Sequence, residues 1–108
     1  MDISRAGWDI GKFDDADWGS WGSGGRARAK VLATGDGFYL ALVEAEPGYK
    51  GDPHEHRATE FHYLIEGSIR NQGVTMNAGD AYVAASGSTH ADFETKTGAK
   101  YVTIFKLA

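Results

Sequence analysis

The sequence predicts a single all-β domain, built as a double-sheet jelly roll or a small barrel, and three observations support this. The chain has 108 residues, which is near the common size of one domain and large enough for a single core. It contains 15 glycines but only two prolines, with short apolar runs between turn signals. No segment has a convincing helical period. Eight or nine short strands must pair or close to hide their edges, which a jelly roll or barrel achieves.

The first 25 residues differ from the rest of the chain. Trp8, Phe13, Trp18 and Trp21 lie among Gly, Ser and Asp residues without a period. Disordered tails are usually poor in aromatic residues, so this segment is unlike a free tail. We expect residues 1–25 to form an arm that packs on an apolar patch, either of its own barrel or of a partner subunit, and residues 26–108 to form the barrel.

The remaining residues divide into candidate strands in chain order. Turn sequences that tolerate positive φ separate several of them, at residues 34–37, 71–73, 77–80 and 95–98. The segment 38–46 is apolar on both faces, so its alternation does not tell which face meets the interior. The expected strands are 27–33, 38–46, 54–56, 60–66, 68–72, 74–77, 81–84, 90–95 and 100–107.

Composition and charge exclude several classes of function. The formal net charge is -4, and no block of Lys and Arg is longer than residues 26–30, which argues against a nucleic-acid surface. In that block Arg26, Arg28 and Lys30 alternate with alanine, which is more typical of a half-exposed strand than of an anion site. Residues 1–15 contain acids where a secretion signal needs an apolar stretch, and no run approaches the ~20 apolar residues of a membrane span. We expect a cytoplasmic protein.

The segment 48–67 has the spacing of a metal site. His54 and His56 are separated by one residue, and a strand places such a pair on one face. Three residues separate His56 from Glu60, and a third imidazole is available at His90, which only tertiary folding can bring near. Because the chain has no cysteine, nitrogen and oxygen must supply the ligands. The pattern predicts a site of three histidines and one carboxylate.

The same segment resembles the first signature of the cupin superfamily at every glycine, histidine and glutamate position. In the second signature Gly79, Gly87 and His90 are in register, whereas Ala85 replaces the usual proline and Glu94 a frequent asparagine. The resemblance covers about residues 38–105. It implies a double-stranded β-helix, a jelly-roll barrel in one domain, with the metal ligands His54, His56, Glu60 and His90.

The strand parity extends the site beyond the ligands. If Glu60 points inward, His62 also points inward, and Phe61 and Tyr63 point outward. His62 is then a candidate catalytic residue: a general base, a hydrogen-bond partner of the substrate or a support for a ligand. The alternative is a core histidine with no part in catalysis. Further candidates for the cavity wall are Asp92 and Glu94, whereas packing is the expected role of Tyr82, Tyr101 and Phe105.

The finer resemblance is to small single-domain cupins, which include the cupin-like domain of zinc-binding anti-sigma factors and the dihydroxyacetophenone and acetylacetone dioxygenases. It implies one divalent transition metal, iron for an oxygenase, with Zn, Mn, Ni or Cu as alternatives. The first hypothesis is a dioxygenase that acts on a diketone, a hydroxyketone or a similar oxygen-chelating small molecule. The alternatives are a zinc-binding sensor or ligand-binding module without catalysis, and a metal-dependent isomerase. We expect a homodimer that binds neither nucleic acid nor membrane.

Overall fold

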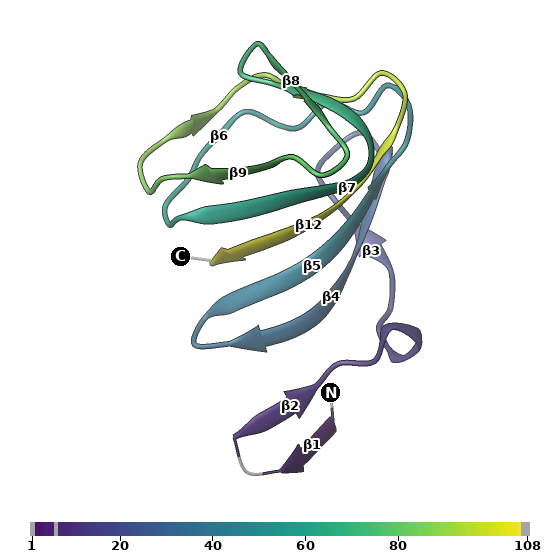
Figure 1. The fold of residues 1–108 in the computed structure, drawn as a ribbon, viewed down its shortest axis with the longest axis vertical. Coiled ribbons are helices and arrows are strands. Elements are labelled where there is room, and N and C mark those ends of the chain that lie inside the picture. Colours follow the sequence, from purple (N-terminus) through teal and green to yellow (C-terminus); the bar gives the residue numbers. More distant parts are fainter. Residues whose placement is uncertain (1, 6, 107–108) are drawn as a thin grey trace.

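The computed structural model describes residues 2–5 and 7–106, with the side chains of residues 2–5 and of His90 outside the description. One long antiparallel sheet forms the body of the molecule (Figure 1). Its strand order is β11 (Phe93–Glu94), β7 (Glu60–Asn71), β12 (Ala99–Lys106), β5 (Phe38–Ala45), β4 (Ala27–Gly35) and β3 (Gly19–Ser20).

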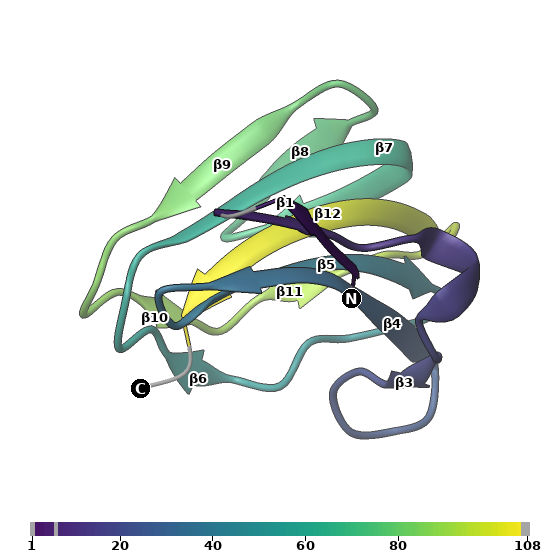
Figure 2. The same ribbon diagram turned by 90° about the horizontal axis from the view of Figure 1, so that it is seen from below.

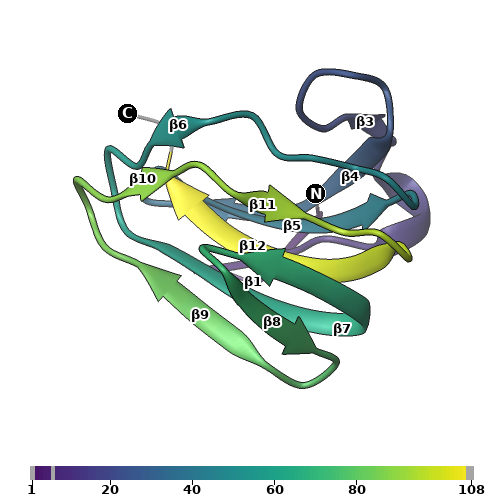
Figure 3. The same cartoon turned by 90° about the horizontal axis from the view of Figure 1, so that it is seen from above.

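Shorter elements complete the fold. Both β8 (Val74–Asn77) and β9 (Ala81–Ala84) pair with β7. A separate two-stranded sheet joins β6 (His54–Glu55) to β10 (Thr89–His90), and it lies with β11 across the face of β5 and β12 (Figures 2 and 3). Before the body come the hairpin β1 (Asp2–Arg5) and β2 (Trp8–Ile10) and the 3₁₀ turn η1 (Phe13–Asp15). The described residues contain no α-helix, as the sequence predicts.

The longest strand, β7, joins the two layers. The sequence predicts two strands here, 60–66 and 68–72, and this is wrong, because the strand continues through Gly67. Its first part pairs with β9 and β12, and its last part with β8 and β11. Gly67 has a φ of 83°, and a Cβ there would lie 2.1 Å from the carbonyl oxygen of Gly98. Glycine therefore allows the strand to cross between layers against its neighbour.

The sheet does not close into a barrel, and this part of the prediction is wrong. Among the described strands, the path of hydrogen-bonded strands ends at β3 and β11, and the β6–β10 pair stands apart. These end strands are only two residues long. The segment between β5 and β6 contains Pro47 and Pro53, which lack the N–H group that a ladder needs. The jelly roll is therefore open along this segment.

The core lies between the two layers. On β5 the buried side chains are Ala41, Val43 and Ala45, which settles the face that the sequence left open. Leu64 of β7 is also fully buried. The cluster continues with Ala27, Ala29, Tyr49, Ile69, Met76, Phe93, Ala99 and Tyr101.

Residues of the predicted arm contact β4 and β12. Lys30 is buried because its Nζ donates to the carbonyl oxygen of Phe13 at 2.8 Å and lies 3.7 Å from the centre of that ring. The guanidinium of Arg28 lies 3.9 Å from the Trp18 ring centre, and Trp21 packs edge-on against Phe105. The strand interpretation is confirmed for residues 27–30, since β4 begins at Ala27, but the expectation that this face is solvated is wrong for Lys30, which is buried. The division into arm and barrel stays a prediction.

The C-terminal part of the chain forms a strand of the main sheet, and the N-terminal part forms a hairpin. The predicted last strand, 100–107, is observed as β12, and Leu107 lies outside the described residues. At the other end the hairpin β1–β2 leaves the body beyond β4 (Figure 1). Within the described chain, no helix has the length and apolar character to cross a membrane.

Candidate functional site

A cavity of about 310 Å³ opens between the two layers of the jelly roll. Five strands and the loop before β6 contribute to its wall, and the segment after β3 adds Trp21 and Gly22. The lining residues are Trp21, Gly22, Tyr49, Gly51, Asp52, His54, Glu60, His62, Tyr82, Phe93, Tyr101, Thr103 and Phe105. The volume is at the lower end of the range for small-molecule sites.

One wall of the cavity is a stack of rings around His62. Its imidazole lies parallel to Tyr82, with ring centres 4.5 Å apart, and to Tyr101, at 4.2 Å. Phe93 meets both His62 and Tyr101 with its edge. The register explains the stack, because His62 on β7 is opposite Tyr82 on β9 and Thr103 on β12. These side chains share the inner face of the sheet.

The parity prediction for β7 is confirmed. His62 is 3% exposed and lines the cavity, whereas Phe61 and Tyr63 are 51% and 49% exposed. The aromatic residues predicted mainly as packing, Tyr82, Tyr101 and Phe105, also line the cavity. They therefore belong both to the core and to the wall of the site.

The phenols of this wall stay protonated. Burial raises the pKa of Tyr101 and of Tyr49. Burial also raises the pKa of Tyr82, and the neighbouring Glu60 carboxylate raises it further. The Tyr82 hydroxyl donates to Oε2 of Glu60 at 2.9 Å. Glu60 therefore has a hydrogen-bond donor that holds its carboxylate at the cavity.

His54 lies at the polar end of the same cavity. Its Nδ1 is 2.9 Å from the carbonyl oxygen of Asp52. Because a carbonyl oxygen only accepts, Nδ1 carries the proton in this bond and Nε2 carries the lone pair. A carbonyl partner of this kind fixes the tautomer of many metal-bound histidines.

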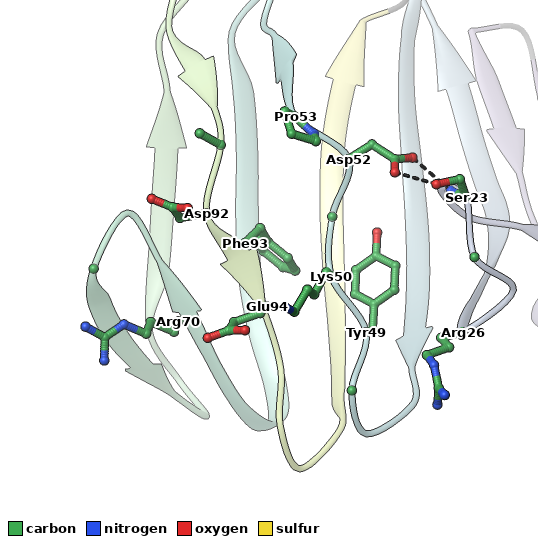
Figure 4. A pocket seen from close by; sticks show the side chains of 15 residues that line it. Ser23, Arg26, Tyr49, Lys50, Asp52, Pro53, Arg70, Asp92, Phe93 and Glu94 are labelled. Atoms are coloured by element: carbon green, nitrogen blue, oxygen red, sulfur yellow. Dashed lines mark hydrogen bonds between the residues drawn. The ribbon is translucent and has the colours of Figure 1, made fainter.

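The loop that carries Asp52 is fixed by the segment after β3. The Asp52 carboxylate accepts from the backbone N–H of Ser23 at 2.8 Å and from its hydroxyl (Figure 4). These hydrogen bonds lower the pKa of Asp52. Ser23 thus holds the side-chain carboxylate of Asp52 in place. The backbone carbonyl of Asp52 in turn orients the imidazole of His54.

His56 takes a different position from its partner in the motif. Its ring centre is 4.7 Å from that of His54, but the residue is buried and lines a second hollow outside the cavity. The predicted strand 54–56 ends one residue early, at Glu55. The backbone N–H of His56 donates to Ser88, and its carbonyl accepts from Gly87.

The structure thus brings part of the predicted ligand set together. His54 and Glu60 line one cavity, His56 contacts His54, and the backbone of His90 pairs directly with that of His54. Among the side chains that the structure describes, which exclude that of His90, no group of three His, Asp or Glu residues is placed to hold a metal ion. The four-ligand set stays a prediction.

A larger hollow, of about 720 Å³, lies on the outer side of the loop before β6 (Figure 4). It shares Tyr49, Gly51, Asp52 and Phe93 with the cavity. Asp92 and Glu94, which the sequence placed as candidates for the cavity wall, line this outer hollow instead. Its other charged residues are Arg26, Lys50 and Arg70. Most of its residues are exposed, so it is a surface groove of mixed charge.

Sequence reasoning missed Thr103 and the role of Trp21 as residues of the cavity wall. For Thr103 a signal exists, because residues 101, 103 and 105 share one face of the last strand. Trp21 follows a segment without a period, so only the folded chain shows that it meets Phe105.

Solved structures with the same fold support a jelly roll of the cupin type. A putative acetylacetone dioxygenase from Methylibium petroleiphilum PM1 is 19% identical, with a TM-score of 0.82, and 98% of this chain matches 81% of it. For KdgF from Halomonas sp. the identity is 19% and the TM-score 0.78, over 92% of this chain and 93% of that one.

A third structure is the complex of Rhodobacter sphaeroides SigE with the anti-sigma ChrR. It is 24% identical with a TM-score of 0.72, and 88% of this chain matches 52% of that chain. At these identities the likeness shows the fold alone. No curated protein matches the sequence.

The match to a family is more extensive. Residues 8–107, nearly the whole chain, match the ChrR cupin-like domain. The match includes the cavity, the β6–β10 pair and the segment that carries Trp21. The resemblance to cupins that the sequence indicated is thereby confirmed. The chain belongs to the ChrR cupin-like domain family.

Proposed function

We propose that the protein is a metal-dependent dioxygenase that acts on a diketone, a hydroxyketone or a similar small molecule with two chelating oxygen atoms. One observation carries the proposal. His54 and Glu60 line the same cavity as His62, so potential metal donors and a potential base face one space of about 310 Å³. Two structures named as acetylacetone dioxygenases, one of them putative, share the fold.

The donor chemistry fits a divalent transition metal. In our proposal His54, His56, Glu60 and His90 would hold the ion, and the hydrogen bond from His54 Nδ1 to Asp52 leaves Nε2 for it. Three neutral imidazoles and one carboxylate suit Fe, Mn, Ni, Cu or Zn. When bound, such an ion supplies a Lewis acid for two substrate oxygens and, if it is iron, redox chemistry with dioxygen.

The chain's own residues have separate tasks in this proposal. His62 accepts a proton from the enolisable carbon or hydroxyl of the substrate. Tyr82 and Tyr101 fix the plane of its imidazole from both sides. The apolar rings of the wall exclude water from the substrate, which strengthens every hydrogen bond inside the cavity.

Oxygen uptake tests the proposal. We expect iron-loaded protein to consume dioxygen with at least one member of a panel of β-diketones, hydroxyketones and flavonols. His62→Gln should lower kcat by 10²- to 10⁴-fold if His62 is the base, while Glu55→Gln, an exposed change in β6, should leave kcat unchanged. If iron-loaded protein consumes no dioxygen with any compound of the panel, the dioxygenase proposal is wrong.

The second candidate is a zinc-binding sensor or ligand-binding module. The family match itself favours it, because the named domain comes from ChrR, an anti-sigma factor in the complex described above. Stoichiometric zinc and ligand binding without turnover of any compound would support this function. Turnover that depends on iron would exclude it.

We also propose that the protein is a homodimer. Its cytoplasmic location stays a prediction. Trp8 is 64% exposed on the hairpin β1–β2, and Ile10 is exposed beside it. Phe61 and Val83 form an exposed cross-strand pair on the outer face of β7 and β9. A second copy would cover these surfaces. Light scattering should give a dimer for the wild type and a monomer for Trp8→Asp, and a monomeric wild type would contradict the proposal.

A further inference from the structure

A short segment separates the cavity from the outer hollow. It comprises residues 21–25, between β3 and β4, and we call it the strap. Trp21 and Gly22 line the cavity, whereas Ser23 and Gly24 line the outer hollow. We propose that the strap is a gate, which opens to join the two hollows and admits a ligand from the outer hollow into the cavity. The inference rests on the proposed function only in taking this cavity as the ligand site, and it does not involve the metal.

The two hollows are direct neighbours, because four residues line both of them. The shared residues are Tyr49, Gly51, Asp52 and Phe93, and the first three belong to the loop before β6. The strap lies closely against this loop, since a Cβ on Gly22 would be 3.0 Å from the hydroxyl oxygen of Tyr49. Strap and loop thus form a partition, and displacement of the strap would merge the two hollows into one opening.

The loop is the fixed side of this partition. Its backbone N–H groups at Gly48 and Gly51 donate to carbonyl oxygens of the segment that contains β11, at 2.9 and 2.8 Å. The carbonyl oxygen of Tyr49 accepts from the N–H of Thr95 at 3.0 Å. The loop therefore cannot move away without breaking several backbone pairs.

The strap has no comparable ladder. β3 pairs with β4 over only two residues, and the hairpin's last backbone bond runs from the N–H of Trp21 to the carbonyl oxygen of Ala27 at 3.1 Å. Among the described residues, no backbone–backbone hydrogen bond joins residues 22–25 to another segment. Gly24 and Gly25 have φ angles of 89° and 70°, and a Cβ on either would meet no atom within 4 Å. Two exposed glycines without neighbours can absorb the backbone rotation of a hinge.

Side-chain contacts hold the strap closed in this structure. The backbone N–H and the hydroxyl of Ser23 donate to the carboxylate of Asp52 (Figure 4). Trp21 packs edge-on against Phe105, with ring centres 5.5 Å apart. The bonds to Asp52 are exposed to solvent, so they stabilise the closed strap only modestly. We expect the open strap to be a minor state, in about 0.1–10% of the molecules.

Fluorine NMR detects the opening, because 5-fluorotryptophan gives one signal for each of the three tryptophans. Trp21 belongs to the strap, and Trp18, which packs on Arg28 outside it, is the internal control. Loss of a signal in Trp21→Phe or Trp18→Phe assigns the spectrum of the full-length protein. We expect relaxation dispersion from millisecond exchange at Trp21 but not at Trp18. Ser23→Ala should raise the open population about two- to fivefold, and Ser20→Ala on β3 should leave it unchanged.

Entry into the cavity is measured with TEMPOL, a neutral nitroxide that is small enough for a space of about 310 Å³. Its unpaired electron broadens the signals of methyl groups that it approaches. Thr103 lines the cavity, whereas Ile69 is similarly buried farther along β7 and does not line it. In Ser23→Ala the broadening of the Thr103 methyl signal should increase with the open population. The broadening of the Ile69 methyl signals should be the same as in the wild type.

Three results would overturn the inference. They are the absence of exchange at Trp21 in both proteins, equal exchange at Trp18 and Trp21, and equal broadening of Thr103 in wild type and Ser23→Ala. Because these measurements need neither metal nor turnover, their outcome is separate from that of the oxygen assay. An opening strap and entry of TEMPOL without oxygen uptake would support the gate and contradict the dioxygenase. Oxygen uptake by a protein whose strap does not open would support the dioxygenase and contradict the gate.

Discussion

The two ends of the cavity are built in different ways. The aromatic end lies on β7, β9 and β12, whose long ladders hold Tyr82, His62 and Tyr101 in one stack. At the donor end, His54 and His90 lie on β6 and β10, a pair only two residues long in which His54 is exposed, whereas Glu60 lies on β7. A few hydrogen bonds, from Ser23 to Asp52 and from His54 to Asp52, secure it.

This difference suggests a division of roles. A wall formed by packed rings has a fixed shape before any ligand arrives, because close-packed interiors resist deformation. A short strand pair in loops opens more easily and gains order when a ligand binds. The fold thus preorganises the aromatic wall and leaves the histidines on and beside β6 and β10 to be ordered by the ion that we propose.

The largest expected effect concerns the aromatic end. Tyr101→Ala should lower the free energy of unfolding by about 3–5 kcal/mol, because it leaves a cavity beneath His62 and Phe93. Tyr63→Ala, on the outer face of the same sheet, should cost less than about 1 kcal/mol. Urea unfolding measures both changes. Equal losses would mean that the stack does not carry the stability assigned to it.

Hydrogen exchange compares the two ends directly. In metal-free protein the amides of His56 and Gly87, which bond the loops around β6 and β10, should open at a free energy about 2 kcal/mol or more below those of Leu64 and Tyr101. Addition of iron or zinc should slow exchange at His56 and Gly87 selectively. Uniform protection across both regions would remove the contrast between the two ends.

The buried phenols make the aromatic end sensitive to alkali. Burial raises the pKa of Tyr101, whereas the phenol of the unfolded chain ionises near pH 10. The resulting stability is complete below pH 10 and falls as the pH rises above it, by about 1.4 kcal/mol per pH unit for each such tyrosine. Urea unfolding at several pH values above 10 should therefore show a smaller slope in Tyr101→Phe, by up to this amount. Parallel pH profiles for the two proteins would contradict this.

A smaller effect is expected where the arm holds the donor end. Ser23→Ala removes the hydroxyl that donates to Asp52 and should lower the melting temperature slightly, because the bond is exposed to solvent. It should also weaken metal binding, since Asp52 orients His54. Ser20→Ala on β3 is the control and should change neither. A Ser23→Ala protein with unchanged stability and metal affinity would show that this contact does not position the site.

The smallest effect lies outside the cavity, on the outer face of the sheet. The hydrogen bond from Arg28 lowers the pKa of Glu44, so this contribution to stability is present above pH 4.5 and lost as the pH falls below it. Glu44→Gln should cost about 0.2–1 kcal/mol at pH 7, and less in high salt. Thermal unfolding at low and high salt measures this. A loss above 2 kcal/mol would show that the surface network matters as much as the cavity.

Much of the fold was predictable because strand parity and turn glycines are local signals. Strands 74–77 and 81–84 match the structure at both ends, and the alternation from Glu60 to Tyr63 gave the correct inner face. The open edge of the jelly roll was not predictable. It arises because β6 and β10 pair only with each other and do not join the main sheet.

In the candidate site, too, the features that follow from local strand parity were predictable, and those that depend on tertiary pairing were not. The sequence located His62 in the cavity because its neighbours on one strand fixed its direction. It did not show that His56 turns to a second hollow, because β6 ends at Glu55 and parity no longer holds beyond a strand's end. Trp21 and Thr103 come together with His62 only through tertiary pairing, which a single sequence does not display.

The central claim, a metal held by His54, His56, Glu60 and His90, is tested most directly by elemental mass spectrometry of protein purified without chelator or affinity nickel. Wild type and Glu55→Ala should each contain about one iron, manganese, nickel or copper per chain, and His54→Ala and His90→Ala should lose it. Stoichiometric zinc would favour the sensor instead. No metal in any preparation, or equal metal in all four proteins, would contradict the four-ligand site.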